Sequence, residues 1–197
     1  MYNVNHWCFE LVLCVVIIQN KNSIKLVGTP VEQNMQTSLS KRTIGCIGKC
    51  TSGLSIDELD QITDNINKTL NHPRGREIFK KFLEQCDLRD NLECLALFEI
   101  CFEIIEREQK FLQSKKEPLL ESLIENVKQV QEMASDLDGV SQIDRALLER
   151  FNEALNSNSR NSLLSILEDI RNCCRDHLRS IHEKFKQYAS EPCPMSR

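Results

Sequence analysis

The chain has 197 residues, of which 41% are hydrophobic and 27% are charged, and this balance suits a globular protein with one domain of ordinary size. Its formal net charge of −4 at pH 7 supplies no overall basic field, which argues against a nucleic-acid-binding protein. Only six glycines and five prolines are present, and no glycine follows Gly139, as expected for a series of long helices.

The N-terminal region divides into an apolar segment and a polar linker. Residues 7–18 are about as long as the hydrophobic part of a signal peptide and too short to span a bilayer. No lysine or arginine precedes them, and Glu10 interrupts them. Residues 1–20 are therefore either a cleaved signal or a membrane-associating or disordered lead. Residues 21–54 are polar without an apolar period, and we interpret them as a flexible linker.

Ser55 starts the first predicted helix. Ser55 and Glu58 form an S-x-x-E capping box, and apolar residues then recur at three- and four-residue steps, so a helix is predicted over residues 55–71. His72-Pro73 ends this helix, because the residue before a proline is disfavoured in the helical region.

Two further helices are predicted on either side of a polar turn at residues 87–91. The apolar face of the earlier helix ends at Cys86. The apolar face of the later helix runs from Leu92 to Ile105, and in both helices the apolar residues recur at helical spacing. The core residues predicted from these two faces are Phe79, Phe82, Leu83, Leu95, Phe98 and Phe102.

The second half of the chain predicts the remaining helices. Pro118 suits the first turn of a fourth helix, and residues 135–139 form a loop by composition. Residues 141–144 open a fifth helix, which residues 156–159 end. The last helical stretch reaches Tyr188, and it is either one long helix or two helices with a bend.

These segments together predict an all-α domain over residues 55–190 and a short tail over residues 191–197. No strand period, internal repeat or transmembrane span occurs. The motifs GxSxG, HExxH and GxGxxG and the phosphate-binding P-loop are missing as well. We therefore expect a protein-binding module and not an enzyme, with no cofactor, small-molecule substrate or nucleic acid as its ligand.

Histidines and cysteines near the C-terminus are not spaced as metal ligands. His177 and His182 are five residues apart, whereas four would place two ligands on one helix face. Cys173 and Cys174 are adjacent and so point in different directions on a helix. We therefore expect no metal site.

Ten cysteines are many for this length, but they are too few for a disulfide scaffold. The eight that follow the N-terminal segment would suit four bridges in an oxidising compartment, and the other interpretation is that most are reduced thiols in the core. Cys94 and Cys101 lie one heptad apart, about 10 Å along a helix, which is too far for a direct bridge. For Cys46 and Cys50 we expect a bridge to Cys193, or lipidation, before metal binding.

Residues 72–105 resemble the first half of a regulator of G-protein signalling (RGS) domain. Gly75-Arg76 form the expected small-residue turn, and Phe79 with Phe82-Leu83 form F-x-x-F-L. Asp90-Asn91 then end the polar loop before an amphipathic helix, and all these residues stand at the family's offsets without a gap. Asp90-Asn91 have a simpler interpretation as the N-cap of that helix, and in the family both roles coexist.

The resemblance covers Ser55 to Tyr188 and implies a two-lobed helical bundle that binds the activated α subunit (Gα) of a heterotrimeric G protein. It implies a regulator that holds the switch loops of Gα and damps signalling by speeding GTP hydrolysis. Asn91 is then the residue nearest the nucleotide-side machinery. The implied location is the cytoplasm, at the membrane if the N-terminus associates with lipid.

The second half departs from the family pattern. Asp136-Leu137-Asp138 stand where the family presents Asn before Leu-Asp, and Leu95 replaces the usual Trp. On the last helix, Asp169 with Arg171 or Arg175 substitutes for an Asp-Ser and Arg set at a different spacing. We therefore expect weak activation of GTP hydrolysis. The implied partner-binding residues are Asp90, Asn91, Asp136, Asp138, Asp169, Arg171 and Arg175.

A different class of protein also fits. A signal-bearing chain with up to four disulfides would be a secreted binding protein on an RGS-like scaffold, without GTPase activation. Asn67 begins an N-K-T glycosylation sequon, which matters only if the chain enters the secretory pathway.

Overall fold

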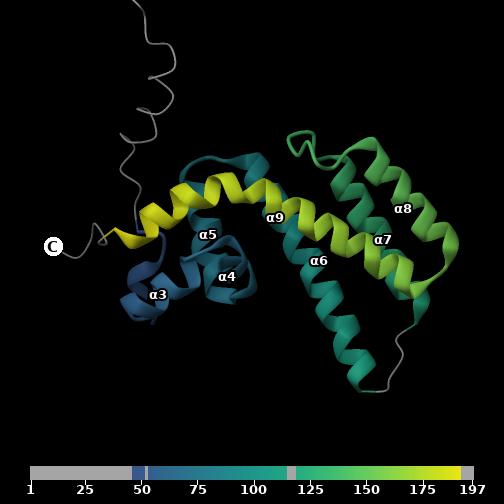
Figure 1. Ribbon diagram of the computed structural model, residues 1–197, viewed down its shortest axis with the longest axis horizontal. Coiled ribbons are helices and arrows are strands. Elements are labelled where there is room, and N and C mark those ends of the chain that lie inside the picture. The colour runs from purple at the N-terminus through teal and green to yellow at the C-terminus, as the bar shows by residue number, and fades with distance from the viewer. Residues whose placement is uncertain (1–45, 52, 115–118, 192–197) are drawn as a thin grey trace, which may run out of the picture. The chain divides into compact units, whose positions relative to one another are not determined.

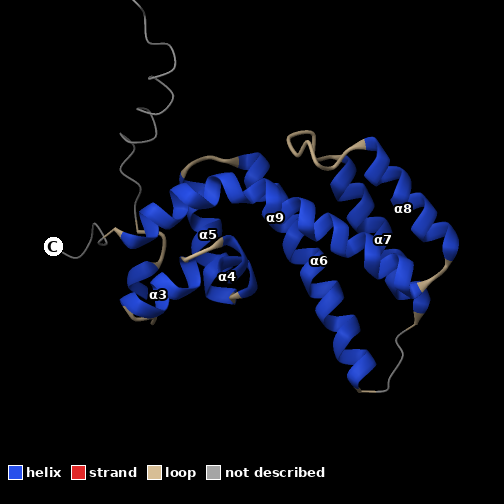
Figure 2. Cartoon of the chain, in the orientation of Figure 1, coloured by secondary structure: helices blue, strands red, loops and turns tan. Residues whose placement is uncertain are grey.

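The computed structural model describes residues 46–51, 53–114 and 119–191 (Figure 1). These residues form helices joined by short loops, without any strand (Figure 2), so the predicted all-α class is confirmed. None of the described helices is both long and apolar enough to cross a lipid bilayer. The elements are the 3₁₀ turn η1 (Lys49–Thr51), α3 (Ile56–Thr63), α4 (Ile66–Asn71), α5 (Pro73–Gln85), α6 (Arg89–Gln113), α7 (Leu120–Ser135), α8 (Arg145–Ser157) and α9 (Arg160–Ser190).

The capping box at the start of α3 forms as predicted. Ser55 Oγ accepts a hydrogen bond from the Glu58 N–H at 3.2 Å, and the Glu58 carboxylate accepts one from the Ser55 N–H at 2.8 Å. The single helix predicted over residues 55–71 is wrong, because Asn65 adopts an extended backbone and interrupts it. Its side chain accepts from the Lys68 N–H at 3.0 Å and so caps a second helix, α4.

The turn between α5 and α6 is shorter than the sequence suggested. α6 begins at Arg89, so Asp90 and Asn91 lie in its first turn and not before it. The N-cap is Leu88, which makes no side-chain capping hydrogen bond. The N-cap interpretation of Asp90-Asn91 is therefore wrong. Asp90 still suits this position, because a carboxylate interacts favourably with the N-terminal end of the helix dipole.

The later helix boundaries agree with the sequence. Asp144 caps α8 by accepting from the Leu147 N–H at 2.9 Å. Asn158 closes α8 in a left-handed conformation with φ of 48°. The last stretch is one helix of 31 residues, α9, which curves along its length in Figure 1.

α9 is the element on which the other helices pack. α3, α4 and α5 contact one another and the part of α9 that carries His182 and Phe185, whereas α8 meets the part that carries Asp169. α6 makes the most extensive contact with α9, and α7 packs on α6, α8 and α9 (Figure 1). The hydrophobic face of α9 is consequently buried along most of its length.

Five of the six core residues expected from the sequence are buried, with exposed fractions of 3% or less. They are Phe79, Phe82, Leu83, Leu95 and Phe98. Phe79 and Phe82 pack on Phe185 of α9, with ring centroids 4.8 and 5.5 Å away. Phe102 is instead only half-buried and so lies outside the core.

Gly75 has a packing role at the start of α5. A Cβ at this position would lie 2.5 Å from the Thr69 carbonyl oxygen of α4, so a larger residue would push the two helices apart. The end of the predicted linker also packs on the helices, because Ile47 is completely buried and Lys49 is 9% exposed. The linker therefore does not extend as free chain through residues 46–51.

Candidate functional site

The first turn of α6 and the loop between α7 and α8 meet at Asp90 and Gly139. A Cβ on Gly139 would lie 2.8 Å from Asp90 Oδ2 and 3.1 Å from Asp90 Cβ. A side chain at position 139 would therefore have to displace the Asp90 carboxylate, so the glycine leaves room for it. Two segments that the sequence pattern singled out separately are thus in contact.

The loop after α7 is anchored by two apolar side chains. Leu137 is 8% exposed and Val140 is 1% exposed, while Asp136 and Asp138 are exposed. The Ile143 N–H donates to the Val140 carbonyl at 2.9 Å, which closes a turn before α8. Burial of the apolar residues therefore holds the two carboxylates on the outer side of the loop.

Asn91 is half-buried beside Asp90 in the first turn of α6. Among the described residues its side-chain amide is not engaged in an intramolecular hydrogen bond. A carboxamide can donate and accept at the same time, so this group is suited to contact a backbone segment of a partner.

Asp169 of α9 and Asp144, the residue that ends the loop after α7, both act electrostatically on Cys173. Asp169 also forms an ion pair with Arg150 of α8. Burial raises the pKa of the neighbouring Cys173 thiol, and the carboxylates of Asp169, Asp176 and Asp144 raise it further, while Arg150 lowers it. Asp144 caps α8 where the loop ends, five residues after Gly139. Sequence analysis identified Asp144 as a helix opener only.

Arg171 and Arg175 do not join Asp169. At 3.6 residues per turn, Arg171 lies about 200° and Arg175 about 240° around the helix axis from Asp169. Arg171 forms an ion pair with Glu168 at 2.5 Å, and Arg175 donates to the Asn172 side chain at 2.9 Å. Of the seven predicted partner-binding residues, four lie in the two segments that meet at Gly139, and Asp169 shares with the loop-ending Asp144 an effect on the Cys173 thiol. We call Asp90, Asn91, Asp136, Asp138 and Asp169 the loop surface.

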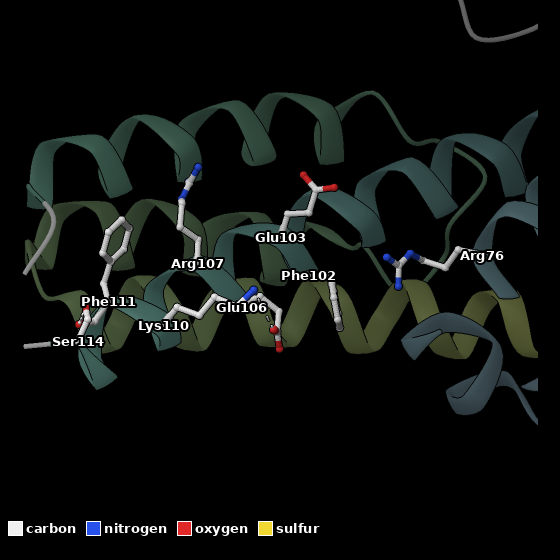
Figure 3. Close-up of a pocket in the computed structure, with 8 residues that line it drawn as sticks. All are labelled: Arg76, Phe102, Glu103, Glu106, Arg107, Lys110, Phe111 and Ser114. Carbon is white, nitrogen blue, oxygen red and sulfur yellow. Dashed lines mark hydrogen bonds and ion pairs between the residues drawn. The ribbon is translucent and has the colours of Figure 1, made fainter. Parts of the chain in front are cut away.

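A pocket of about 650 Å³ lies along the outer face of α6 (Figure 3). The Arg76 guanidinium lies 5.0 Å from the centroid of the Phe102 ring and so covers part of this ring. Arg76 also donates to the Leu70 carbonyl at 2.7 Å and to the Glu99 carboxylate at 3.2 Å, so its charge is already compensated. The lining residues are Arg76, Phe102, Glu103, Glu106, Arg107, Lys110, Phe111 and Ser114, none of which belongs to the loop surface.

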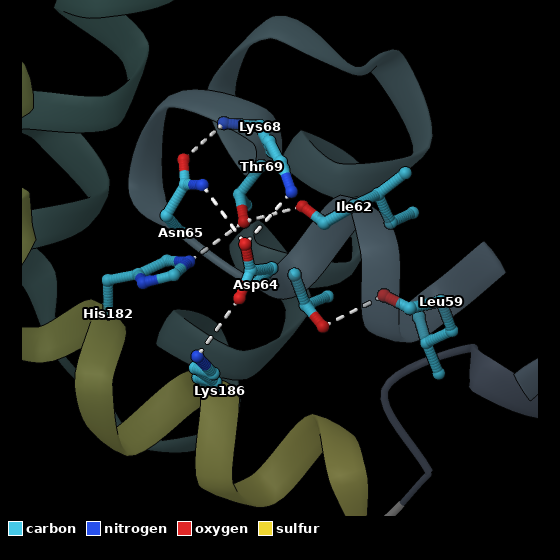
Figure 4. Close-up of polar contacts among 9 residues, drawn as sticks. Leu59, Ile62, Asp64, Asn65, Lys68, Thr69, His182 and Lys186 are labelled. Atoms are coloured by element: carbon cyan, nitrogen blue, oxygen red, sulfur yellow. Dashed lines mark hydrogen bonds and ion pairs between the residues drawn. The ribbon is translucent and has the colours of Figure 1, made fainter. Parts of the chain in front are cut away.

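A buried polar pair that sequence analysis missed joins α4 to α9 (Figure 4). Thr69 Oγ1 donates to the Ile62 carbonyl at 3.0 Å and lies 2.8 Å from His182 Nε2. Because the only hydroxyl hydrogen is used on Ile62, the imidazole donates from Nε2. Burial lowers the pKa of His182 to about 4. The available signal was the position of His182 between Ile181 and Phe185, on the apolar stripe of α9.

The sequon at Asn67 overlaps this pair. Its threonine, Thr69, is fully buried and holds His182, which gives the residue a structural role independent of glycosylation. Asn67 itself is exposed on α4.

Most cysteines in the described part of the chain are free thiols: Cys46, Cys86, Cys94, Cys101, Cys173 and Cys174. Burial raises the pKa of Cys101 to about 12, so this thiol stays protonated at neutral pH. Cys50 is disulfide-bonded, and Cys193, its expected partner, lies outside the described residues. Within the described ranges no group of three His, Cys, Asp or Glu side chains is placed to hold a metal ion.

Comparisons of this chain with family models, with curated proteins and with solved structures return no match. Function is therefore inferred from the residues themselves.

Proposed function

We propose that this chain is an RGS-like regulator that binds an activated Gα subunit through the loop surface and damps G-protein signalling. The observation that carries this proposal is the contact of Asp90 with the loop at Gly139. The resemblance assigns partner contacts to Asp90-Asn91 and to Asp136–Asp138, and these two segments lie far apart in sequence. Their juxtaposition makes one surface available to one partner.

The mechanism acts on chemistry that belongs to Gα. GTP hydrolysis in this class depends on a glutamine that orients water and on an arginine that stabilises the transition state. A protein that binds the mobile switch loops in their transition-state arrangement preorganises both groups, and it lowers the barrier without inserting a catalytic residue. Asn91 supports this role, since its uncommitted amide can donate to one backbone group and accept from another.

Activation of hydrolysis is proposed to be weak, because the loop surface is acidic. Asp136 stands where the resemblance leads us to expect Asn, so a hydrogen-bond donor is replaced by a charge that only accepts. Negative charge at an interface is repulsive unless the partner offers Lys or Arg opposite to it. The proposal therefore favours Gα subunits with basic switch loops, in the cytoplasm at or near the membrane.

The test compares nucleotide states of several Gα classes. Binding of the full chain to the aluminium-fluoride-activated form should exceed binding to the GDP form, because only the former has the switch arrangement of the transition state. Asn91→Ala should remove this preference while leaving the thermal melt unchanged, since the side chain is not a core residue. Single-turnover GTP hydrolysis, with and without the chain, then measures the size of the activation.

Glu84→Ala offers a matched control, because Glu84 is exposed near the end of α5 and lies outside the loop surface. This variant should keep the preference for activated Gα. Equal binding to both nucleotide forms, or no binding to any Gα class, would remove the proposed function and leave only the fold.

The secreted alternative keeps one observation in its favour, the disulfide at Cys50, because structural disulfides persist in oxidising compartments. The free thiols of Cys86, Cys94, Cys101 and Cys174 are buried and count against a chain with four bridges. The mass of the protein from expressing cells and from their medium, before and after thiol alkylation, distinguishes the two. A secreted form that lacks residues 1 to about 20 and carries glycan on Asn67 would favour the alternative.

A further inference from the structure

The second half of α6 lines the pocket of Figure 3 with its outer face. Glu108 is the last buried residue of this helix, although the helix continues to Gln113, so the end of α6 projects from the core. Between positions 102 and 111 the pocket is lined by aromatic and charged side chains, which we call the charged face. They are Phe102, Glu103, Glu106, Arg107, Lys110 and Phe111.

The charged face consists of two rows, because residues four positions apart are neighbours on an α-helix. Glu103, Arg107 and Phe111 form one row, and Phe102, Glu106 and Lys110 form the other. Glu103 and Arg107 point to one side of α6 in Figure 3, whereas Phe102 and Glu106 point to the other. Each row therefore contains one aromatic ring, one acid and one base, with the base four residues after the acid.

These charges are little used within the chain. Lys110 and Glu106 lie 3.9 Å apart, and both side chains are exposed, so this pair contributes little to stability. Within the described ranges neither Glu103 nor Arg107 forms a hydrogen bond or an ion pair, although their spacing and order suit one. All four charges are thus available to a partner.

The order of the charges makes the face complementary to itself when the helix is reversed. A two-fold axis perpendicular to α6, midway between Glu106 and Arg107, places a second copy of the helix alongside in the opposite direction. Each Glu106 is then level with Arg107 of the second copy, and each Glu103 is level with its Lys110. The axis repeats both pairings, so four acid–base pairs span the contact.

The aromatic rings lie at the two ends of this arrangement. Phe102 and Phe111 are half-buried and lie about 14 Å apart along the helix axis. In the reversed pair each Phe102 is level with Phe111 of the second copy, and rings of this kind supply apolar area to an interface. A parallel pair would instead set each charge level with its own kind, which is repulsive.

We propose that the charged face is a homodimer interface, in which the α6 helices of two copies of this chain pack antiparallel about a two-fold axis. A single helix pair is a small interface, so the dimer forms reversibly, with a dissociation constant in the micromolar range. Glu103 lies about 20 Å along α6 from Asp90. The interface is therefore separate from the loop surface and does not depend on the proposed function.

Sedimentation equilibrium of the full chain over a wide range of concentrations measures the dimer, and non-reducing denaturing gels exclude a covalent one. Glu103→Lys and Lys110→Glu should each weaken self-association about tenfold, because each sets like charges level with one another twice. An equimolar mixture of the two variants should associate about as tightly as the wild type. In the mixed dimer every residue at position 103 again meets an opposite charge at position 110.

Lys80→Glu is the matched control, since it makes the same charge change at an exposed position on α5, outside the charged face. This variant should dimerise as the wild type does. A wild type that stays monomeric at every concentration would overturn the proposal, whatever else covers this face. Dimerisation that survives both single variants would overturn it too, by placing the contact elsewhere, and a mixture that does not restore association would exclude the antiparallel arrangement.

Discussion

Gly139 lies against the Asp90 side chain so closely that its missing Cβ would fall 2.8 Å from a carboxylate oxygen. The two residues are held by different elements, the loop after α7 and the first turn of α6. Buried Leu137 and Val140 anchor the loop, and α6 packs on α9. The absence of a side chain at position 139 thus leaves room for the Asp90 carboxylate.

Gly139→Ala should destabilise the protein by about 1 kcal/mol, because the new methyl group must displace the Asp90 carboxylate. In an Asp90→Ala background the same change should cost nothing or stabilise slightly, since alanine reduces the freedom of the unfolded chain. Urea unfolding of the four proteins in this double-mutant cycle gives the coupling. Equal costs in both backgrounds would show that the two side chains do not compete for the same space.

Phe82→Ala should destabilise the protein by about 3–5 kcal/mol, as expected for a buried aromatic ring. Phe82 is 2% exposed, and its ring lies 5.5 Å from that of Phe185 and 5.8 Å from that of Tyr188. Phe102→Ala is the matched control, with an expected loss of about 1–2 kcal/mol because its ring is half-exposed. Chemical denaturation measures both. A loss below about 1 kcal/mol for Phe82→Ala would contradict its place in the core.

Lowering the pH should reduce the free energy of unfolding because of His182. Its pKa is about 4 in the folded state, because burial opposes the charge, and near 6.5 in the unfolded chain. Between these values the unfolded state binds a proton that the folded state excludes. Stability is therefore fully present above pH 6.5 and falls towards pH 4, by about 2 kcal/mol between pH 7 and pH 5.

The measurement for His182 is urea unfolding at both pH values in the wild type and in two variants. His182→Gln lacks the titrating ring and should lose this part of the pH dependence, although it is less stable at pH 7. His177→Gln, on the same helix, should behave as the wild type. An unchanged pH dependence in His182→Gln would contradict the assignment to this ring.

Lys49→Met should loosen the end of α9. The Lys49 ammonium group donates to the carbonyl oxygens of Tyr188 at 2.9 Å and Glu191 at 2.7 Å. Methionine keeps the apolar stem of lysine but cannot donate to these carbonyls, so we expect a loss of about 1–2 kcal/mol. Hydrogen exchange should accelerate at the last turn of α9, while the middle of the helix stays protected. Lys110→Met, at an exposed position on α6, should change neither quantity. Unaltered exchange at the last turn in Lys49→Met would show that the lysine does not hold it.

The sequence predicts best those features that depend on neighbouring residues. The capping box at Ser55 and the cap at Asp144 follow from local hydrogen bonding, and both form as expected. The helix break at Asn65 was missed because apolar spacing continues across it, although Asn is itself a capping residue. Phe102 continues the apolar stripe of α6, but whether a stripe is covered depends on where the partner helix ends, which periodicity does not report.

The candidate site was predictable only in part, for the same reason. Asp90, Asn91, Asp136 and Asp138 were found from a resemblance, but their contact depends on Gly139, whose role appears only when both segments are in place. Helix geometry alone could have predicted that Arg171 does not share a surface with Asp169. Two positions on a helix that are two residues apart face nearly opposite directions, so no single surface contains both.

Substitutions on the two sides of α9 should therefore affect Gα binding differently. If the partner covers the loop surface, Asp169→Asn should weaken binding of activated Gα about five- to tenfold, by removing a charge that α8 and α9 hold in place. Arg171→Gln and Arg175→Gln should change binding less than twofold, because these residues lie on other faces of α9 than Asp169 and are engaged with Glu168 and Asn172.

Loss of the ion pair between Asp169 and Arg150 is a competing explanation for weaker binding by Asp169→Asn. Arg150→Gln separates the two, since it breaks the same pair but leaves the Asp169 carboxylate available. If the carboxylate itself meets a basic switch loop, Arg150→Gln should bind activated Gα at least as well as the wild type, because a repelling cation is removed. Equilibrium titration of fluorescently labelled Gα provides the measurement. Stronger losses from the two α9 arginine variants than from Asp169→Asn would place the partner on the other flank and exclude the loop surface.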